Sequence, residues 1–202
     1  VRTLPCRVQK MARLAPDVML LQLRLPASER LQFLAGQYID ILLKDGRRRS
    51  FSIANAPHAD EALELHVRLV PGGHFTPRVF DTMKERDILR MEGPFGSFFL
   101  REDSDKPMIL LASGTGFAPI KAIIEQLFQQ KSDRPMTLYW GARDRSGLYL
   151  NALAEGWAAS HTEFRYVPVL SEPAAADAWS GRRGLVHRAV MEDFPDLSGH
   201  QV

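Results

Sequence analysis

The pattern of apolar residues changes once along this 202-residue chain, between Asp103 and Lys106. Before that point, short segments alternate apolar and polar residues and are separated by glycine, proline and aspartate. After it, continuous apolar segments alternate with amphipathic ones. Period-two alternation is typical of antiparallel strands with one exposed face, whereas apolar strands followed by helices are typical of a parallel sheet. The pattern therefore predicts two domains, residues 1–103 and residues 104–202.

The first domain is expected to contain six short strands, at residues 4–11, 18–25, 38–43, 49–53, 63–69 and 88–92, and one helix at about residues 76–84. In the fifth of these strands, Glu64, His66 and Arg68 point away from the apolar side. Many short alternating strands favour a closed antiparallel barrel. The three histidines His66, His74 and His187 are interpreted as surface or packing residues and not as catalysts.

The second domain is expected to have strands at residues 108–112, 136–140 and 164–170, with helices after each of them. Strands that are apolar throughout and alternate with helices predict a doubly wound parallel sheet. A further strand is expected to begin at His200, close to the end of the sequence, and the first residue is Val1 instead of methionine. We therefore interpret the chain as a fragment whose second domain is C-terminally truncated.

Composition excludes several classes of protein. A net charge of +2 is too small to favour nucleic acid and is compatible with a small anionic ligand. The single cysteine, Cys6, excludes a disulfide framework or a cysteine-rich metal site built from this sequence alone, so no metal site is expected. The sequence has no signal peptide and no apolar run long enough to cross a membrane, which predicts a cytoplasmic protein.

A glycine-rich turn follows the first apolar strand of the second domain and precedes an amphipathic helix. It contains Gly114, Thr115, Gly116 and, in the first helical turn, Pro119. Small residues at this place let the backbone approach a diphosphate, whose charge is met by free N–H groups and the helix N-terminus. A glycine pair by itself is weak evidence, so a purely structural turn stays open as an alternative.

The ends of the next two strands are also expected to face the ligand of a doubly wound sheet. These ends carry Gly141 and Arg143 after the second strand, and Ser171 and Glu172 after the third. Arg143 is placed to meet a phosphate or ribose of an adenosine, although exposed loop arginines are usually just solvated. Because no acidic residue ends the second strand, the choice between NADH and NADPH stays open.

The first domain carries a second candidate site. Three arginines, Arg47 to Arg49, precede Ser50, Phe51, Ser52 and Ile53, and alternation places Arg49 and Phe51 on one face. An arginine beside an aromatic ring suits a ligand that has both a phosphate and a flat ring, whereas the alternative is a solvated hairpin. A glycine turn from Gly72 and Gly73 to Thr76 leads into a helix and is suited to another phosphate.

These motifs occur in the order and spacing of the ferredoxin–NADP reductase superfamily, which the whole chain resembles. It looks most similar to bacterial iron–sulfur flavoprotein reductases, such as CDP-6-deoxy-glucoseen reductases and the phenol hydroxylase reductase components. The resemblance implies a Greek-key flavin-binding barrel followed by an NAD(P)-binding domain. The family's later cysteine- and glycine-rich motif, the strand after it and a four-cysteine iron–sulfur domain are missing, which would leave the strand at residues 108–112 with an open edge.

The resemblance also implies residue roles, which divide between the two sites. For the flavin, Arg49 is implied at the phosphate, and Phe51 is implied against the ring, in place of the family's usual tyrosine. Ser52 is implied near N5, as the catalytic position, and Ser50 belongs to the same motif. Val67 and Arg68 are implied along the flavin, and Gly72, Gly73 and Thr76 at the FAD pyrophosphate. For the nicotinamide nucleotide, the implied residues are Gly114, Thr115, Gly116 and Pro119.

The function implied is transfer of a hydride from NADH or NADPH to bound FAD, with FMN a less favoured cofactor. Electrons would then pass singly to an acceptor protein or to a [2Fe-2S] centre in a missing upstream domain. The cofactors perform the chemistry and the protein positions them, so no general acid or base is named. Two alternatives stay open, a non-catalytic nucleotide-binding or regulatory module and a two-domain interaction protein whose glycine turns are only turns.

Overall fold

The computed structural model describes residues 2–202 and divides into two compact units. The first unit extends to Leu100 and also includes Ala118–Gln130, which is nearly all of helix α2 (Phe117–Gln129). The second unit consists of Arg101–Phe117 and Lys131–Val202. The helix that follows the glycine turn is therefore part of the first unit, although the turn itself is part of the second.

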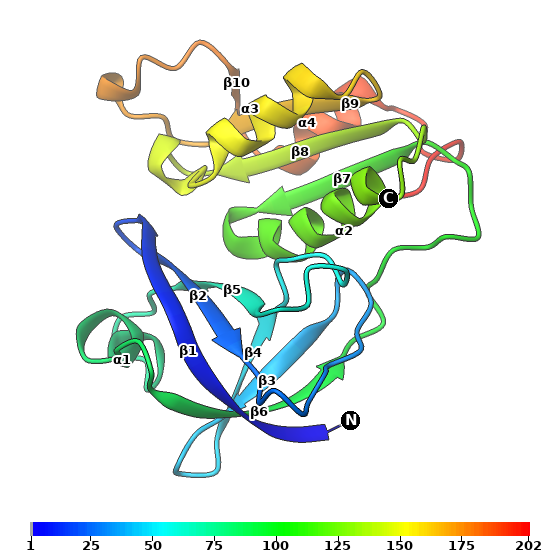
Figure 1. Ribbon diagram of the computed structural model, residues 1–202. Helices are drawn as coiled ribbons and strands as arrows, with labels where there is room; N and C mark the ends of the chain where they lie inside the picture. Colours follow the sequence, from blue (N-terminus) through cyan, green and yellow to red (C-terminus); the bar gives the residue numbers. More distant parts are fainter. Residues whose placement is uncertain (1) are drawn as a thin grey trace. The chain divides into compact units, whose positions relative to one another are not determined.

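The first unit is an antiparallel sheet of six strands, as the alternating pattern predicts (Figure 1). In the order β4-β3-β6-β1-β2-β5, the strands are β4 (Arg48–Ser52), β3 (Tyr38–Leu42), β6 (Ile88–Phe95), β1 (Arg2–Ala15), β2 (Val18–Arg24) and β5 (Leu63–Arg68). Helix α1 (Thr76–Asp81) ends three residues earlier than expected. The inward-facing residues of the strands form one core, in which Val8, Leu21, Ile39 and Leu65 are fully buried.

The sheet does not close into a continuous barrel. Its edge strands β4 and β5 meet through a single antiparallel bridge between Ile53 and Leu65, beside a hydrogen bond of 2.7 Å from the Ala54 N–H to the Glu64 carbonyl. No further pairing joins the described residues of β4 to those of β5. We call this interrupted junction the seam, and it has Phe51 on one of its edges and Val67 on the other.

The second unit is built on a four-stranded parallel sheet with the order β10-β9-β8-β7. The strands are β7 (Met108–Ser113), β8 (Met136–Ala142), β9 (Phe164–Leu170) and β10 (Arg182–Arg183). The helical elements are α3 (Asn151–Ser160), α4 (Val186–Asp193) and the 3₁₀ turns η1 (Gly114–Gly116), η2 (Arg145–Gly147) and η3 (Ala175–Asp177). Strand β10 was not predicted, because two residues carry no periodic signal.

The expected strand at His200 is reduced to one parallel bridge, between Gln201 and Met108. The Ile109 N–H donates to the Gln201 carbonyl at 2.8 Å, so the chain returns to the free edge of β7. The order across the sheet is then β10-β9-β8-β7 followed by the segment at Gln201. The chain crosses back over β7 in this order, as in the doubly wound sheet that was predicted.

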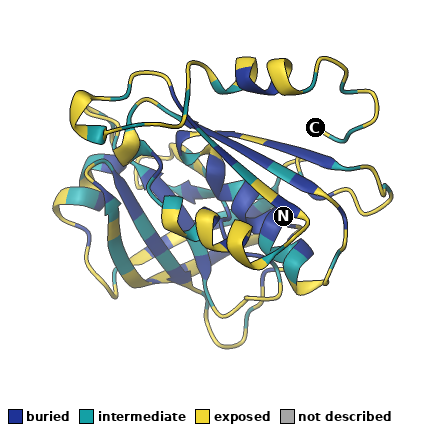
Figure 2. Ribbon diagram, turned by 90° about the horizontal axis from the view of Figure 1, so that it is seen from above, coloured by how far each residue is buried: buried dark blue, intermediate teal, exposed yellow. Residues whose placement is uncertain are grey.

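The strands of the second unit are apolar because their side chains are buried in its core. Ile109, Tyr139 and Val169 are buried against Ala189 and Val190 of α4. Figure 2 shows the strands of both sheets as largely buried, whereas the helices keep exposed faces. Among the described residues, no helix is long and apolar enough to cross a membrane.

Candidate functional site

Arg49 differs from the two arginines before it in having no charged partner. Arg47 forms an ion pair with Asp45, and Arg48 forms one with Glu92. The Arg49 guanidinium donates to the Arg48 carbonyl at 2.7 Å, and no carboxylate of residues 2–202 lies within ion-pair distance of it. Arg49 is half-buried at the seam, so its charge is available to an anionic ligand.

The ring of Phe51 lies close to the segment that follows the glycine turn of the first unit. Its ring centroid lies 5.6 Å from that of Phe75, the residue that precedes α1. Gly72 has a φ of +73°, a backbone conformation that favours glycine, and no atom lies within 4 Å of the position that a Cβ would take there. The structure therefore brings together the ring of Phe51 and an open turn.

The hydroxyl of Thr76 is used inside the turn. Its Oγ1 accepts a hydrogen bond from the Val70 N–H at 2.8 Å and donates to the Val70 carbonyl at 3.3 Å. A Cβ at Gly73 would lie 2.9 Å from the same carbonyl, so glycine is required for the turn to close. The Gly73 N–H also donates to the Val70 carbonyl, at 2.9 Å, so contact of Gly73 and Thr76 with a diphosphate stays a prediction.

The other residues predicted for the first site do not all face the same side of the sheet. The Ser50 hydroxyl donates to Asp40 at 2.6 Å, on the face opposite to Arg49, and Ser52 is half-buried beside Tyr38. Val67 is fully buried in the core, which leaves only its backbone for a ligand. Arg68 lies 3.2 Å from Asp17 through its Nε atom, without the geometry of a hydrogen bond.

In the second unit, the two glycines of the turn have different roles. Gly114 is buried with a φ of +51°, and its carbonyl accepts a hydrogen bond of 3.0 Å from Trp140 Nε1. The Trp140 ring stacks on Phe117 with centroids 3.9 Å apart, which anchors the turn. A Cβ at Gly116 would meet no atom within 4 Å. Gly116 is therefore the point where a ligand can approach the backbone, and Thr115 and Pro119 flank it.

Gly141 has a packing role that the sequence did not reveal. A Cβ at this position would lie 2.6 Å from the Cβ of Val186, so glycine lets α4 approach β8. The next residues continue the ladder, because the Ser171 N–H donates to the Ala142 carbonyl at 3.0 Å. Arg143 and Glu172 then form an exposed ion pair of 3.7 Å at the carboxyl ends of β8 and β9.

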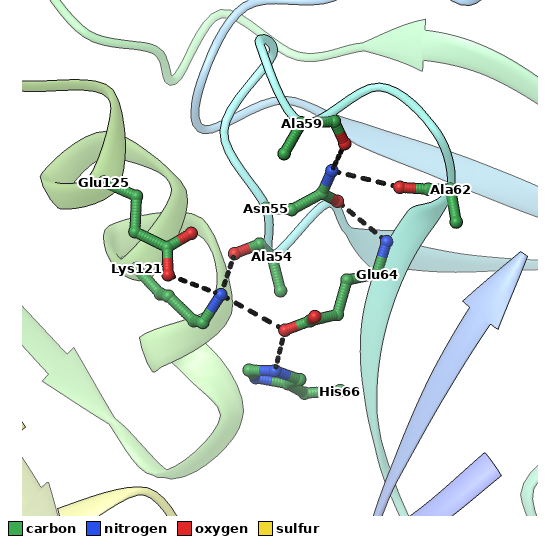
Figure 3. A network of polar contacts seen from close by, with 8 residues as sticks. All are labelled: Ala54, Asn55, Ala59, Ala62, Glu64, His66, Lys121 and Glu125. Atoms are coloured by element: carbon green, nitrogen blue, oxygen red, sulfur yellow. Dashed lines mark hydrogen bonds and ion pairs between the residues drawn. The ribbon is translucent and has the colours of Figure 1, made fainter. Parts of the chain in front are cut away.

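A buried cluster of charged residues lies beside the seam and was missed by the sequence analysis (Figure 3). Lys121 of α2 is 7% exposed, and its Nζ lies 3.2 Å from the Ala54 carbonyl, 3.2 Å from Glu64 and 2.8 Å from Glu125. Glu64 also accepts a hydrogen bond of 3.1 Å from His66 Nε2. The only local signal was the Lys121–Glu125 spacing on one helix face.

Asn55 fixes the loop that carries this cluster. Its side-chain N–H₂ donates to the carbonyls of Ala59 and Ala62, and its Oδ1 accepts from the Glu64 N–H at 2.8 Å. Together the contacts join α2, the segment after β4, and β5 at the closed end of the seam. His66 is thus a buried packing residue, which is one of the two roles expected for it.

The charge states in this cluster follow from its contacts. Burial by itself raises the pKa of Glu64, but the hydrogen bond from His66 and the charge of Lys121 outweigh it and hold the pKa at about 2. Burial lowers the pKa of His66, although its hydrogen bond to Glu64 acts against this. His66 is therefore neutral at pH 7 and donates its Nε2 proton to an ionised Glu64.

We expect the cluster to make the protein less stable in acid. The pKa of Glu64 is about 4.5 when unfolded and lower when folded, so its stabilisation is complete above pH 4.5 and is lost as the pH falls toward 2. The loss amounts to about 3 kcal/mol. His66 acts in the same direction from pH 6.5 downward, because its folded pKa is also the lower one.

Urea unfolding at a series of pH values tests this expectation. The Glu64→Gln variant should show a flatter decline of the free energy of unfolding below pH 4.5, whereas Glu163→Gln, at an exposed position, should follow the unmodified protein. Parallel curves for Glu64→Gln and the unmodified protein would contradict the assignment.

Two family models match this chain. The oxidoreductase FAD-binding domain matches residues 5–100, and the oxidoreductase NAD-binding domain matches residues 110–202. An NAD(P)H-flavin reductase of Aliivibrio fischeri is 34% identical over 199 residues, with 96% of this chain and 82% of that protein covered. The chain therefore belongs to the family of FAD- and NAD-binding oxidoreductases.

Two longer proteins are more similar in sequence. The CDP-6-deoxy-L-threo-D-glycero-4-hexulose-3-dehydrase reductase of Yersinia pestis is 44% identical over 197 residues, which cover 98% of this chain and 58% of that protein. The crystal structure of the Amycolatopsis cytochrome P450 reductase GcoB superposes with a TM-score of 0.89 at 37% identity, over 98% of this chain and 60% of that one. The chain thus spans somewhat more than half the length of these two relatives.

Proposed function

We propose that this chain is the hydride-accepting module of a flavoprotein reductase, with FAD at the seam and NADH or NADPH at the turn from Gly114 to Gly116. The observation that carries the proposal is the guanidinium of Arg49, which has no charged partner among the described residues and lies two positions before Phe51, on the same face of β4. A half-buried cation without an ion-pair partner, on the same strand face as an aromatic ring, suits a ligand that combines a phosphate with a flat ring. FAD is favoured over FMN because a second open turn, at Gly72, adjoins Phe75.

In this proposal the residues bind and orient, and none of them transfers a proton. Arg49 holds a phosphate, Phe51 supports a ring, and Gly116 lets a diphosphate reach backbone N–H groups. When bound, the flavin supplies the redox chemistry, taking a hydride from the nicotinamide and releasing electrons one at a time. The bridge at the seam and the contact of Lys121 with the Ala54 carbonyl hold the end of β4, the strand that carries Arg49 and Phe51.

The acceptor of the electrons is also part of the proposal. We infer an iron–sulfur centre, in a separate protein or in a linked domain, since a relative of the chain is the reductase component of terephthalate 1,2-dioxygenase of Comamonas. A cytoplasmic location follows, because NADH and NADPH are supplied there. The exposed pair of Glu172 and Arg143 would offer a carboxylate to a ribose hydroxyl of NADH and a guanidinium to the extra phosphate of NADPH, so the proposal includes either nucleotide.

Anaerobic mixing of the FAD-loaded protein with NADH and, in parallel, with NADPH tests the proposal. We expect the yellow flavin absorbance to bleach, and to bleach faster with one nucleotide than with the other. A protein that binds both FAD and NADH but keeps its colour would be a nucleotide-binding module without turnover. A protein that takes up no flavin would refute the proposal entirely.

The substitution Gly116→Ala tests the nucleotide turn. A methyl group would fit the protein without a clash, but it would occupy the space that a diphosphate needs. We expect the KM for the nicotinamide nucleotide to rise about tenfold or more, a cost of roughly 1.4 kcal/mol, with an unchanged free energy of unfolding. Gly156→Ala, at a second glycine with open surroundings, is the control and should leave the KM unchanged.

A further inference from the structure

An exposed isoleucine on the first unit is surrounded by arginines. Ile88, the first residue of β6, is 62% exposed. Arg7 of β1 lies opposite Ile88 in one strand pair and opposite Arg24 of β2 in the other. Residues that lie opposite one another project from the same face of a sheet, and so does Arg90, two positions after Ile88. We call these four residues the basic face.

The arginines of the basic face have no compensating charge. No carboxylate of residues 2–202 lies within 4.0 Å of Arg7, Arg24 or Arg90, whereas Arg2 and Arg48, on the same sheet, are ion-paired. Like charges directly opposite one another, as Arg7 and Arg24 are, destabilise an antiparallel pair. Three unpaired cations in a chain with a net charge of only +2 therefore form a local surplus of positive charge.

A groove opens beside these arginines, at the point where β1 changes its partner. Strand β1 pairs with β6 from Arg2 to Arg7 and with β2 from Arg7 onward, while the chain after β2 leaves the sheet (Figure 1). The space between is a groove of about 550 Å³. Its lining is mainly apolar, and Arg7 and Arg24 complete it. The other lining residues are Pro5, Cys6, Leu25, Pro26, Ala27 and Ile88.

We propose that this groove binds an acidic segment of a partner protein, with carboxylates on Arg7 and Arg24 in the groove and on Arg90 on the same sheet face, and with an apolar side chain beside Ile88. The planar guanidinium group matches a carboxylate through two parallel hydrogen bonds, and charge complementarity of this kind selects partners. A nucleic acid would place its phosphates on the arginines but would leave the apolar lining of the groove without a contact. Pro5 lacks an N–H, so the edge of β1 is poorly suited to the addition of a partner strand.

The position of the groove separates it from the seam. In the order β4-β3-β6-β1-β2-β5, strands β6 and β1 are the middle pair, whereas the seam lies between the two outermost strands. A partner on the basic face would therefore leave the seam free. The inference does not depend on the proposed function, since binding can be measured without any turnover.

Fluorescence anisotropy with the FAD-loaded protein tests the proposal. The probe is a short labelled peptide in which glutamates flank a central pair of leucines. We expect the double substitution Arg7→Gln, Arg24→Gln to raise the Kd about tenfold, Ile88→Ser to raise it about threefold, and added salt to weaken binding. Arg188→Gln, at an exposed arginine of α4, is the matched control and should leave the Kd unchanged.

Three results would overturn the proposal. One is equal binding by the arginine variant and the unmodified protein. Another is equal binding of a peptide with lysines in place of the glutamates. The third is tighter, arginine-dependent binding of duplex DNA or of phosphatidylglycerol vesicles than of the peptide. Because all the substituted side chains are exposed, unchanged thermal unfolding would show that the variants are intact.

Discussion

The substitution Lys121→Met is expected to lower the free energy of unfolding by about 3 kcal/mol. Lys121 is the only cation that the described contacts place on both Glu64 and Glu125. Its removal would leave two carboxylates, one of them largely buried, without a compensating charge, and the Ala54 carbonyl without its donor. Breaking a buried ion pair on one side is costly because the remaining charge is neither solvated nor paired.

Urea unfolding at pH 7 measures this effect, and two further variants define its cause. Lys10→Met, at an exposed lysine of β1, should change the free energy of unfolding by less than about 0.5 kcal/mol. The double variant Lys121→Met, Glu64→Gln should be more stable than Lys121→Met alone, because it removes one uncompensated charge. If Lys121→Met unfolded like the unmodified protein, the cluster would have no structural importance.

The substitution Arg49→Gln is expected to weaken FAD binding about 100-fold, which corresponds to roughly 3 kcal/mol. The loss would arise because charge-assisted hydrogen bonds to a phosphate disappear. The apo protein should keep its stability, since Arg49 makes one hydrogen bond, to a neighbouring carbonyl, and no ion pair with the described residues. Flavin fluorescence or isothermal titration calorimetry measures the Kd.

Arg47→Gln is the matched control for this substitution. It removes the same charge two positions away, from a side chain that pairs with Asp45 in the hairpin. We expect its FAD affinity to stay within about threefold of the unmodified protein. FMN should lose as much affinity as FAD in Arg49→Gln, because the phosphate next to the ribityl chain is common to both. Equal losses in Arg47→Gln and Arg49→Gln would mean only a general effect of charge.

The elements of the fold could be predicted because their signals are local. Alternation along residues 63–69 and the continuous apolar run at residues 108–112 each express which faces of one strand are buried. The ends of elements were less accurate: β1 runs from Arg2 to Ala15, well beyond the predicted residues 4–11. Pairing with β6 at one end and β2 at the other extends this strand, and the pattern of one segment contains no information on its partners.

Two glycines also show the difference between what the sequence predicts and what only the tertiary structure reveals. Gly116 and Gly141 both follow parallel strands, and the sequence treated both as ligand contacts. Only the structure shows that Gly116 borders open space whereas Gly141 lies against Val186. Alternation with Phe51 already distinguished Arg49 from Arg47 and Arg48, but only tertiary contacts show that Arg49 has no charged partner among the described residues.

By itself, then, the sequence determined two kinds of sheet and the segments that could hold phosphates, since these depend on periods of two and 3.6 residues and on glycine conformation. The tertiary structure alone decided which charges are compensated and which backbone is open. Lys121 and the Ala54 carbonyl are 67 positions apart, and no local pattern links them. Burial between α2 and β5 made Lys121 an internal cation, because the energy of a charge depends on the neighbours that folding brings to it.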